Sequence, residues 1–151
     1  MKFDFGLGLV PAHQHYNGNG WVANTASVDN DAFIGKNARV YGYAKVFGDA
    51  AVTDRARVSD NARIYGDAWI TGRGVITGEA KIYGNAIVTG NAKVSGYASV
   101  YDNAVITADA WVFDHASVFG DAKVSDNARV FGTVKVYGDT WITDDISDVY
   151  Y

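Results

Sequence analysis

The sequence has no cysteine, a single proline and no long apolar run among its 151 residues. The absence of cysteine excludes disulfide bonds and thiolate chemistry. The absence of a long apolar run argues against a transmembrane helix, so no membrane partner is expected. Basic residues are also few, because 13 Lys and Arg stand against 17 Asp and Glu. A general nucleic-acid binder presents a basic surface, so nucleic acid is an unlikely partner on this composition.

What the chain does contain is a repeat of six residues. From Val22 to Ile142, every sixth residue is Val or Ile. The third position of the repeat is usually Gly, Asp or Asn, and the fifth is Ala except at Gly74, Val134, Thr140 and Ile146. Val and Ile favour strands, whereas Gly, Asn and Asp tolerate the positive φ of tight turns. Each hexad therefore predicts a short strand followed by a corner.

The chain has neither the apolar period of a helix nor room in six residues for a hairpin reversal, so stacked solenoid coils fit best. The pattern resembles the hexapeptide-repeat proteins. That resemblance implies an all-β, single-domain, left-handed parallel β-helix with three faces and eighteen residues per coil. Its handedness follows from the resemblance alone, since general chirality rules favour right-handed crossovers. Residues 22–147 would then form about seven coils, after a cap in residues 1–21 and before a tail in residues 148–151.

Eighteen-residue spacing places outward side chains in columns, and one column is aromatic. Two interpretations stay open: a platform for sugar rings or bases, and a ladder that only stabilises parallel strands. Corner aspartates beside this face weaken the nucleic-acid interpretation. The members of this predicted ladder are Phe47, Tyr65, Tyr83, Tyr101, Phe119 and Tyr137.

A second face combines a hydroxyl column with an apolar column. Apolar stripes of this kind more often mark a protein contact, and hexapeptide-repeat proteins commonly trimerise along their shafts. We therefore expect a homo-oligomer, a trimer or a dimer, with ice binding through the threonines as an alternative. The predicted contact residues are Thr53, Thr71, Thr89, Thr107, Trp69, Ile87 and Val105. The third face, which includes Arg39 and Arg57, has the mixed composition of an ordinary solvated surface.

The N-terminal segment has two features of its own. Phe3, Phe5, Leu7 and Leu9 alternate with polar residues or glycine, which predicts a strand that covers the open end of the first coil or binds another subunit. The following "HQHYNGNGWV" resembles the lead-in to the repeats of some phage-borne and bacterial hexapeptide proteins of unknown role. We expect a protein without a signal peptide, either cytoplasmic or virion-associated.

Few residues of the sequence indicate a catalytic site. Many hexapeptide-repeat proteins are acyltransferases, which use a histidine base, a loop that interrupts the coils and a groove between subunits. Here no hexad is interrupted, and His115 lies at a predicted corner. His13 and His15 are weak candidates for a metal pair without a clear third ligand, so no cofactor is expected. The sequence favours a non-enzymatic rigid β-solenoid that binds an unknown protein or glycan partner or builds an assembly. The alternative is an acyltransferase-like enzyme with an inter-subunit site.

Overall fold

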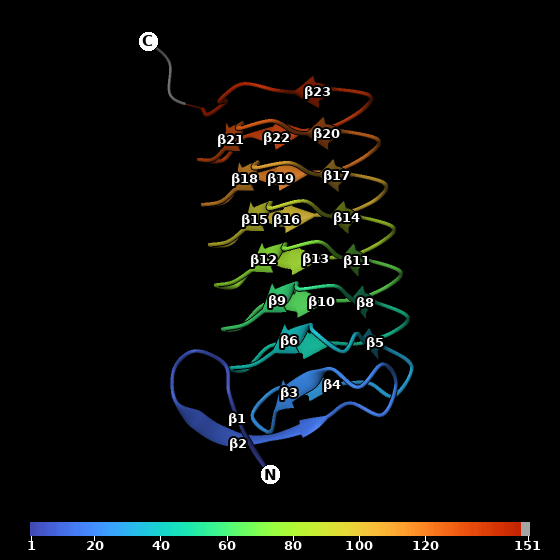
Figure 1. Ribbon diagram of the computed structural model, residues 1–151. Helices are drawn as coiled ribbons and strands as arrows, with labels where there is room; N and C mark the ends of the chain where they lie inside the picture. The colour runs from blue at the N-terminus through green and yellow to red at the C-terminus, as the bar shows by residue number, and fades with distance from the viewer. Residues whose placement is uncertain (149–151) are drawn as a thin grey trace.

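The computed structural model describes residues 1–148, and they form a parallel β-solenoid in which the strands of the repeat pair with strands one coil away (Figure 1). This confirms the prediction of an all-β, single-domain fold with about seven coils of eighteen residues. No helix occurs in these residues, and hence none that could cross a membrane. The left-handed sense of the coils stays a prediction from the resemblance.

Three sheets run along the shaft, and we name each by its most distinctive residues. The aromatic sheet contains seven strands, which are β4 (Ser27–Val28), β7 (Lys45–Val46), β10 (Arg63–Ile64), β13 (Lys81–Ile82), β16 (Ser99–Val100), β19 (Ser117–Val118) and β22 (Lys135–Val136). The threonine sheet also contains seven, which are β5 (Phe33–Ile34), β8 (Ala51–Val52), β11 (Trp69–Ile70), β14 (Ile87–Val88), β17 (Val105–Ile106), β20 (Lys123–Val124) and β23 (Trp141–Ile142).

The third sheet, the hairpin sheet, has nine strands because the N-terminal segment adds two antiparallel ones. Its strands are β1 (Lys2–Asp4), β2 (Leu9–Gln14), β3 (Trp21–Ala23), β6 (Arg39–Val40), β9 (Arg57–Val58), β12 (Val75–Ile76), β15 (Lys93–Val94), β18 (Trp111–Val112) and β21 (Arg129–Val130).

The core consists of one inward Val or Ile and one inward Ala from most hexads. Ile82 and Ala86 in the middle of the shaft are both fully buried. At the third position the backbone turns with positive φ, as at Gly66 with φ 68° and Asp60 with φ 59°. That conformation explains the Gly, Asp and Asn of the repeat, because other side chains adopt it only at a cost.

The corner aspartates also bind the backbone of the next coil. Along the regular shaft, the backbone N–H of the third position finds no backbone acceptor, unlike its neighbours in the hexad. A carboxylate from the coil before accepts this N–H at 3.0–3.1 Å in four places. The pairs are Asp54 with Gly72, Asp60 with Gly78, Asp102 with Gly120, and Asp114 with Gly132.

The N-terminal cap is a hairpin rather than the single strand that the alternation from Phe3 to Leu9 predicted. Gly6 and Gly8 take φ values of 104° and 100°, and both donate their N–H groups to the Asp4 carboxylate. This turn splits the apolar residues between two environments. Phe3 and Phe5 pack against Trp21 and Tyr41, whereas Leu7 is 85% exposed and Leu9 69% exposed.

The residues between the hairpin and the first coil close the N-terminal end of the core. Ile34 donates its N–H to Asn17 and accepts from Gly20, so this turn pairs with the first strand of the threonine sheet. A Cβ at Gly18 would clash with the backbone carbonyl oxygen of Ile34, and a Cβ at Gly20 would clash with that of Gly35. The Gly-x-Gly of the lead-in is therefore required by close approach of two backbones.

The C-terminal coil is shorter than the others. Ile146 pairs with Val130, sixteen residues earlier, where the regular spacing would be eighteen. The last hexad of the predicted 22–147 repeat therefore leaves the regular register. Asp145 consequently lies beside Arg129 and forms the one salt bridge found in residues 1–148. Residues 149–151, most of the predicted tail, lie outside the described residues.

Candidate functional site

The aromatic column forms an unbroken stack on the aromatic sheet. The ring centroids of Tyr65 and Tyr83 are 4.8 Å apart and those of Tyr83 and Tyr101 are 4.9 Å apart, with interplanar angles of 1° and 4°. The stack continues to Phe47 at one end and to Phe119 and Tyr137 at the other. Because each ring covers the face of its neighbour, a ligand would meet ring edges along most of the ladder. The ladder's role in binding stays a prediction.

Stacking also changes the ionisation of the central tyrosines. Burial, followed by the neighbouring Tyr65 and Tyr101, raises the pKa of Tyr83 above its ordinary value of 10.0. Burial and then Asp102 raise the pKa of Tyr101 as well. Both hydroxyls are therefore held in the neutral form, which makes the ladder a poor source of a tyrosinate base.

The apolar column of the threonine sheet is partly exposed and is interrupted only by Lys123, between Val105 and Trp141. Trp69, Ile87 and Val105 are direct partners across successive parallel strands. Trp69 is 47% exposed, and Trp141 at the end of the column is 65% exposed. The structure thus brings the predicted contact residues together on one face, and their role in a subunit contact stays a prediction.

The exposed tryptophans are fixed by a recurring hydrogen bond. Each donates its Nε1–H to a Ser or Thr hydroxyl sixteen residues earlier, on the preceding coil. The pairs are Trp69 with Thr53 at 3.0 Å, Trp111 with Ser95 at 2.9 Å, and Trp141 with Ser125 at 2.7 Å. An indole held in this way loses little conformational entropy when a partner covers it.

The hydroxyl column of the threonine sheet includes three hydroxyls that are already hydrogen-bonded, those of Thr53, Thr71 and Ser125. Thr53 accepts the indole N–H of Trp69, and Thr71 donates to Asp54 at 2.7 Å. The Thr71 hydroxyl, followed by the N–H of Gly72, lowers the pKa of Asp54 below its usual value. An ice-binding surface needs an open, regular hydroxyl array, so these bonds disfavour that alternative.

The hairpin sheet carries a cationic cluster on the face whose mixed sequence predicted an ordinary solvated surface. Arg39 and Arg57 are direct cross-strand partners, and Arg55 and Arg73 stand one coil apart at the adjoining corner. Lys36, Arg39, Arg55 and Arg57 line a depression of about 530 Å³, and Arg55, Arg57 and Arg73 line a second one beside it. The sequence contains a signal for this cluster, because Arg39 and Arg57 are one coil apart in the repeat, and so are Arg55 and Arg73.

The three histidines are held by different contacts and do not meet. His13 Nδ1 lies 2.8 Å from the Asn24 side-chain oxygen, whereas buried His15 bonds through Nε2 to the Ala32 carbonyl at 2.9 Å. His115 stacks on Tyr97 at 4.9 Å at an exposed corner. Within residues 1–148, no group of three or more His, Asp or Glu side chains is arranged to hold a metal.

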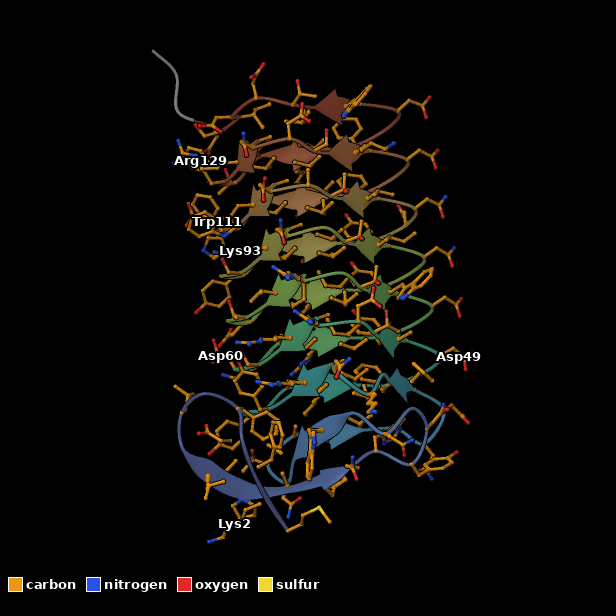
Figure 2. The ribbon with its side chains drawn as sticks, in the orientation of Figure 1. Lys2, Asp49, Asp60, Lys93, Trp111 and Arg129 are labelled. Atoms are coloured by element: carbon orange, nitrogen blue, oxygen red, sulfur yellow. The ribbon has the colours of Figure 1, made fainter. Side chains whose placement is uncertain are left out.

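The labelled residues give the orientation of these surfaces (Figure 2). Lys93, Trp111 and Arg129 lie one above another along the hairpin sheet, and Asp49 lies on the opposite side of the shaft. The cationic cluster belongs to the coils below Lys93, toward the N-terminus. The hairpin sheet and the threonine sheet offer two candidate surfaces that adjoin at the corner of Arg55 and Arg73.

Comparison with known proteins supports the repeat architecture. Residues 56–72 and 80–96 match the family model described as YdcK Beta solenoid repeat. Neither a curated protein nor a solved structure matches the chain. By its sequence repeat and its fold, this protein is a repeat β-solenoid.

Proposed function

We propose that this protein is a non-enzymatic binding scaffold in which a second copy of the chain docks on the threonine sheet. The observation that carries the proposal is the exposed apolar column with tryptophans fixed by hydrogen bonds, Trp69 to Thr53 and Trp141 to Ser125. Rigid, amphipathic aromatic side chains are typical of the energetic centres of protein interfaces. Exposed apolar stripes along a whole face likewise favour a protein contact over free solvation.

A second copy is favoured because two shafts of the same chain share one repeat distance. Stacked side chains recur every 4.8–4.9 Å along the shaft, as the tyrosine ladder illustrates. Two identical columns laid side by side can therefore interdigitate over several coils without losing register. The column is also nearly uncharged, with Lys123 as its single ionisable residue, so little charge would be desolvated on contact.

The enzymatic alternative has less support. An acyltransferase-like site would need His115 or His13 in a groove between subunits. His115 lies on the corner between the hairpin and aromatic sheets, and His13 lies on β2 of the N-terminal hairpin. A contact through the threonine sheet leaves that corner outside the interface. The phage origin suggested by the N-terminal lead-in also stays a prediction, and the proposed function does not depend on it.

The proposal is tested by the molar mass of the protein in solution. Sedimentation equilibrium at micromolar concentration should give a multiple of 16.2 kDa for the wild type. Ile87→Lys should shift the distribution to monomer, because a charge would be buried at the contact. Ser99→Lys places the same charge at the equivalent position of the aromatic sheet and should leave the assembly intact. A strictly monomeric wild type, or equal effects of both variants, would contradict the proposal.

A further inference from the structure

We infer that the cationic cluster on the hairpin sheet is a binding site for a compact oligophosphate. The cluster consists of Lys36, Arg39, Arg55, Arg57 and Arg73, and it holds four of the six arginines of a chain whose net charge is −4. Arg39 and Arg57 lie on the hairpin sheet itself, and Lys36, Arg55 and Arg73 lie on the corner that joins it to the threonine sheet. The inference rests on the placement of these cations and not on the proposed self-association.

No carboxylate of the described residues lines the two depressions, so the positive charge of the cluster is not neutralised there. Arg39 and Arg57 face each other across neighbouring parallel strands, an arrangement in which like charges repel. The Arg39 guanidinium carbon lies 5.1 Å from the centre of the Phe3 ring, and the other cations of the cluster make no ion pair with any residue of 1–148. A fold that keeps like charges together without neutralising them has a cost that a bound anion would remove.

One arginine of the same column, Arg129, is neutralised by a salt bridge. Arg129 lies further along the hairpin sheet, and its cross-strand neighbour is Asp145. Its Nε and terminal nitrogen donate to one carboxylate oxygen at 3.0 Å and 2.6 Å. Side chains one coil apart on this column can therefore meet at hydrogen-bond distance. At the Arg39–Arg57 step, the position equivalent to that carboxylate holds a second arginine.

The carboxylates near the cluster accept hydrogen bonds from groups other than its cations. Asp54 accepts bonds from the Thr71 hydroxyl and the Gly72 N–H, and Asp60 accepts the N–H of Gly78. Asp4 accepts from two N–H groups of its own turn, and Arg39 makes only the smallest contribution to the lowered pKa of Asp4. The remaining polar side chains at the depression, Gln14 and Asn37, are neutral.

The dimensions of the cluster favour a compact ligand over a polymer. The two depressions share Arg55 and Arg57, and the cations span three coils. Beyond Arg73 and Arg57 the same two columns continue with Asn91, Asp109 and Val75, which offer no further positive charge before Lys93. At the other end Trp21 and Phe3 close the depression.

The charge of the cluster favours phosphate over carboxylate. Five cations in so small an area call for several negative charges, and a phosphate group carries more charge than a carboxylate of similar size. The planar guanidinium fork also matches phosphate oxygens with two parallel hydrogen bonds. An inorganic oligophosphate and the phosphate chain of a nucleotide share this chemistry.

Calorimetric titration of the full chain with sodium tripolyphosphate tests the inference. We expect saturable binding with one site per chain, weakened about ten-fold or more in Arg57→Gln, because each bidentate charge-assisted contact is strong. Arg63→Gln removes the same charge from the aromatic sheet and should leave the affinity within about two-fold of wild type. Because Arg57 is exposed and repelled by Arg39, the melting temperature of Arg57→Gln should not fall.

A parallel titration with ATP identifies the source of the phosphate. Tighter binding of ATP than of tripolyphosphate, with the same dependence on Arg57, would indicate a nucleotide, and equal binding an inorganic chain. Three results would overturn the inference: no binding of tripolyphosphate at low salt, equal losses in Arg57→Gln and Arg63→Gln, or binding of a single-stranded oligonucleotide without binding of tripolyphosphate.

Discussion

At the scale of single residues, the third position of the hexad decides which side chains the corners accept. Most of these positions hold Gly or Asp, but Ala108 also adopts a left-handed conformation, with φ 57°. Alanine has neither the freedom of glycine nor the carboxylate with which Asp102 binds the next coil. Ala108 is therefore the third-position residue least suited to the left-handed backbone of its corner.

Ala108→Gly should stabilise the fold by up to about 1 kcal/mol, because relief of the left-handed strain exceeds the added flexibility of the unfolded chain. The expected rise in melting temperature is about 2–4 °C, measured by circular dichroism. Ala110→Gly, the same change at a buried position two residues later, should lower the melting temperature instead. A lower value for Ala108→Gly would contradict this account of the corner.

The tyrosine ladder makes a prediction about alkaline pH. The pKa of Tyr83 is raised in the folded protein, so the associated stability is fully present below pH 10.0 and is lost as the pH rises through the folded value. Tyr83→Phe keeps the stack and removes the titrating hydroxyl, so its melting temperature should fall less between neutral and alkaline pH. Identical profiles for wild type and Tyr83→Phe would show that ionisation of this residue is not coupled to the fold.

At the scale of the structural element, each hexad contributes one short strand, one corner and two inward side chains. The inward alanine is small because each corner joins two of the three sheets around a narrow core. Ala86 is fully buried and packs within the same cluster as Ile82 and Val88. This packing explains why the fifth position tolerates little besides alanine in the regular part of the shaft.

Ala86→Leu should destabilise the protein by about 1–3 kcal/mol or more, because three additional heavy atoms would overpack the core. The measurement is the free energy of unfolding in urea. Asn85→Leu adds a similar side chain at the neighbouring exposed position and should change that free energy much less. An unchanged free energy for Ala86→Leu would contradict the packing of the inward alanines.

At the scale of the whole molecule, the shaft is a one-dimensional stack whose two ends are closed differently. The N-terminal end is covered by the hairpin and the turn that pairs with Ile34. The C-terminal end is held by the shortened coil, in which Asp145 bonds to the side chain and backbone of Arg129. In such stacks each coil contacts only its neighbours, so loss of an end contact should remain local.

Asp145→Asn should speed amide exchange at Phe131 and Ile146 while leaving the exchange of Ile82 unchanged, as measured by hydrogen–deuterium exchange. Acid should act on the wild type in the same way. Bonds from the Arg129 side chain and then its backbone N–H lower the pKa of Asp145, so its contribution is present above the ordinary value of 3.8 and is lost as the pH falls through the folded value. Faster exchange throughout the shaft would contradict this local response.

The sequence by itself determined the repeat, the buried positions and the columns of the shaft. It could do so because one six-residue rule, from Val22 onward, fixes which side chains face inward and which residues lie one coil apart. The 4.8 Å spacing of Tyr65 and Tyr83 follows directly from that rule.

Only the tertiary structure decided what depends on side-chain partners and on departures from the repeat. The glycine turn after Phe5 divided the N-terminal alternation into a hairpin, and Ile146 left the register to place Asp145 beside Arg129. The arginines of the hairpin sheet form a candidate site because the neighbouring carboxylates of Asp54 and Asp60 bind backbone N–H groups instead. Periodicity predicts where a side chain stands, but its hydrogen bonds depend on contacts that no single hexad encodes.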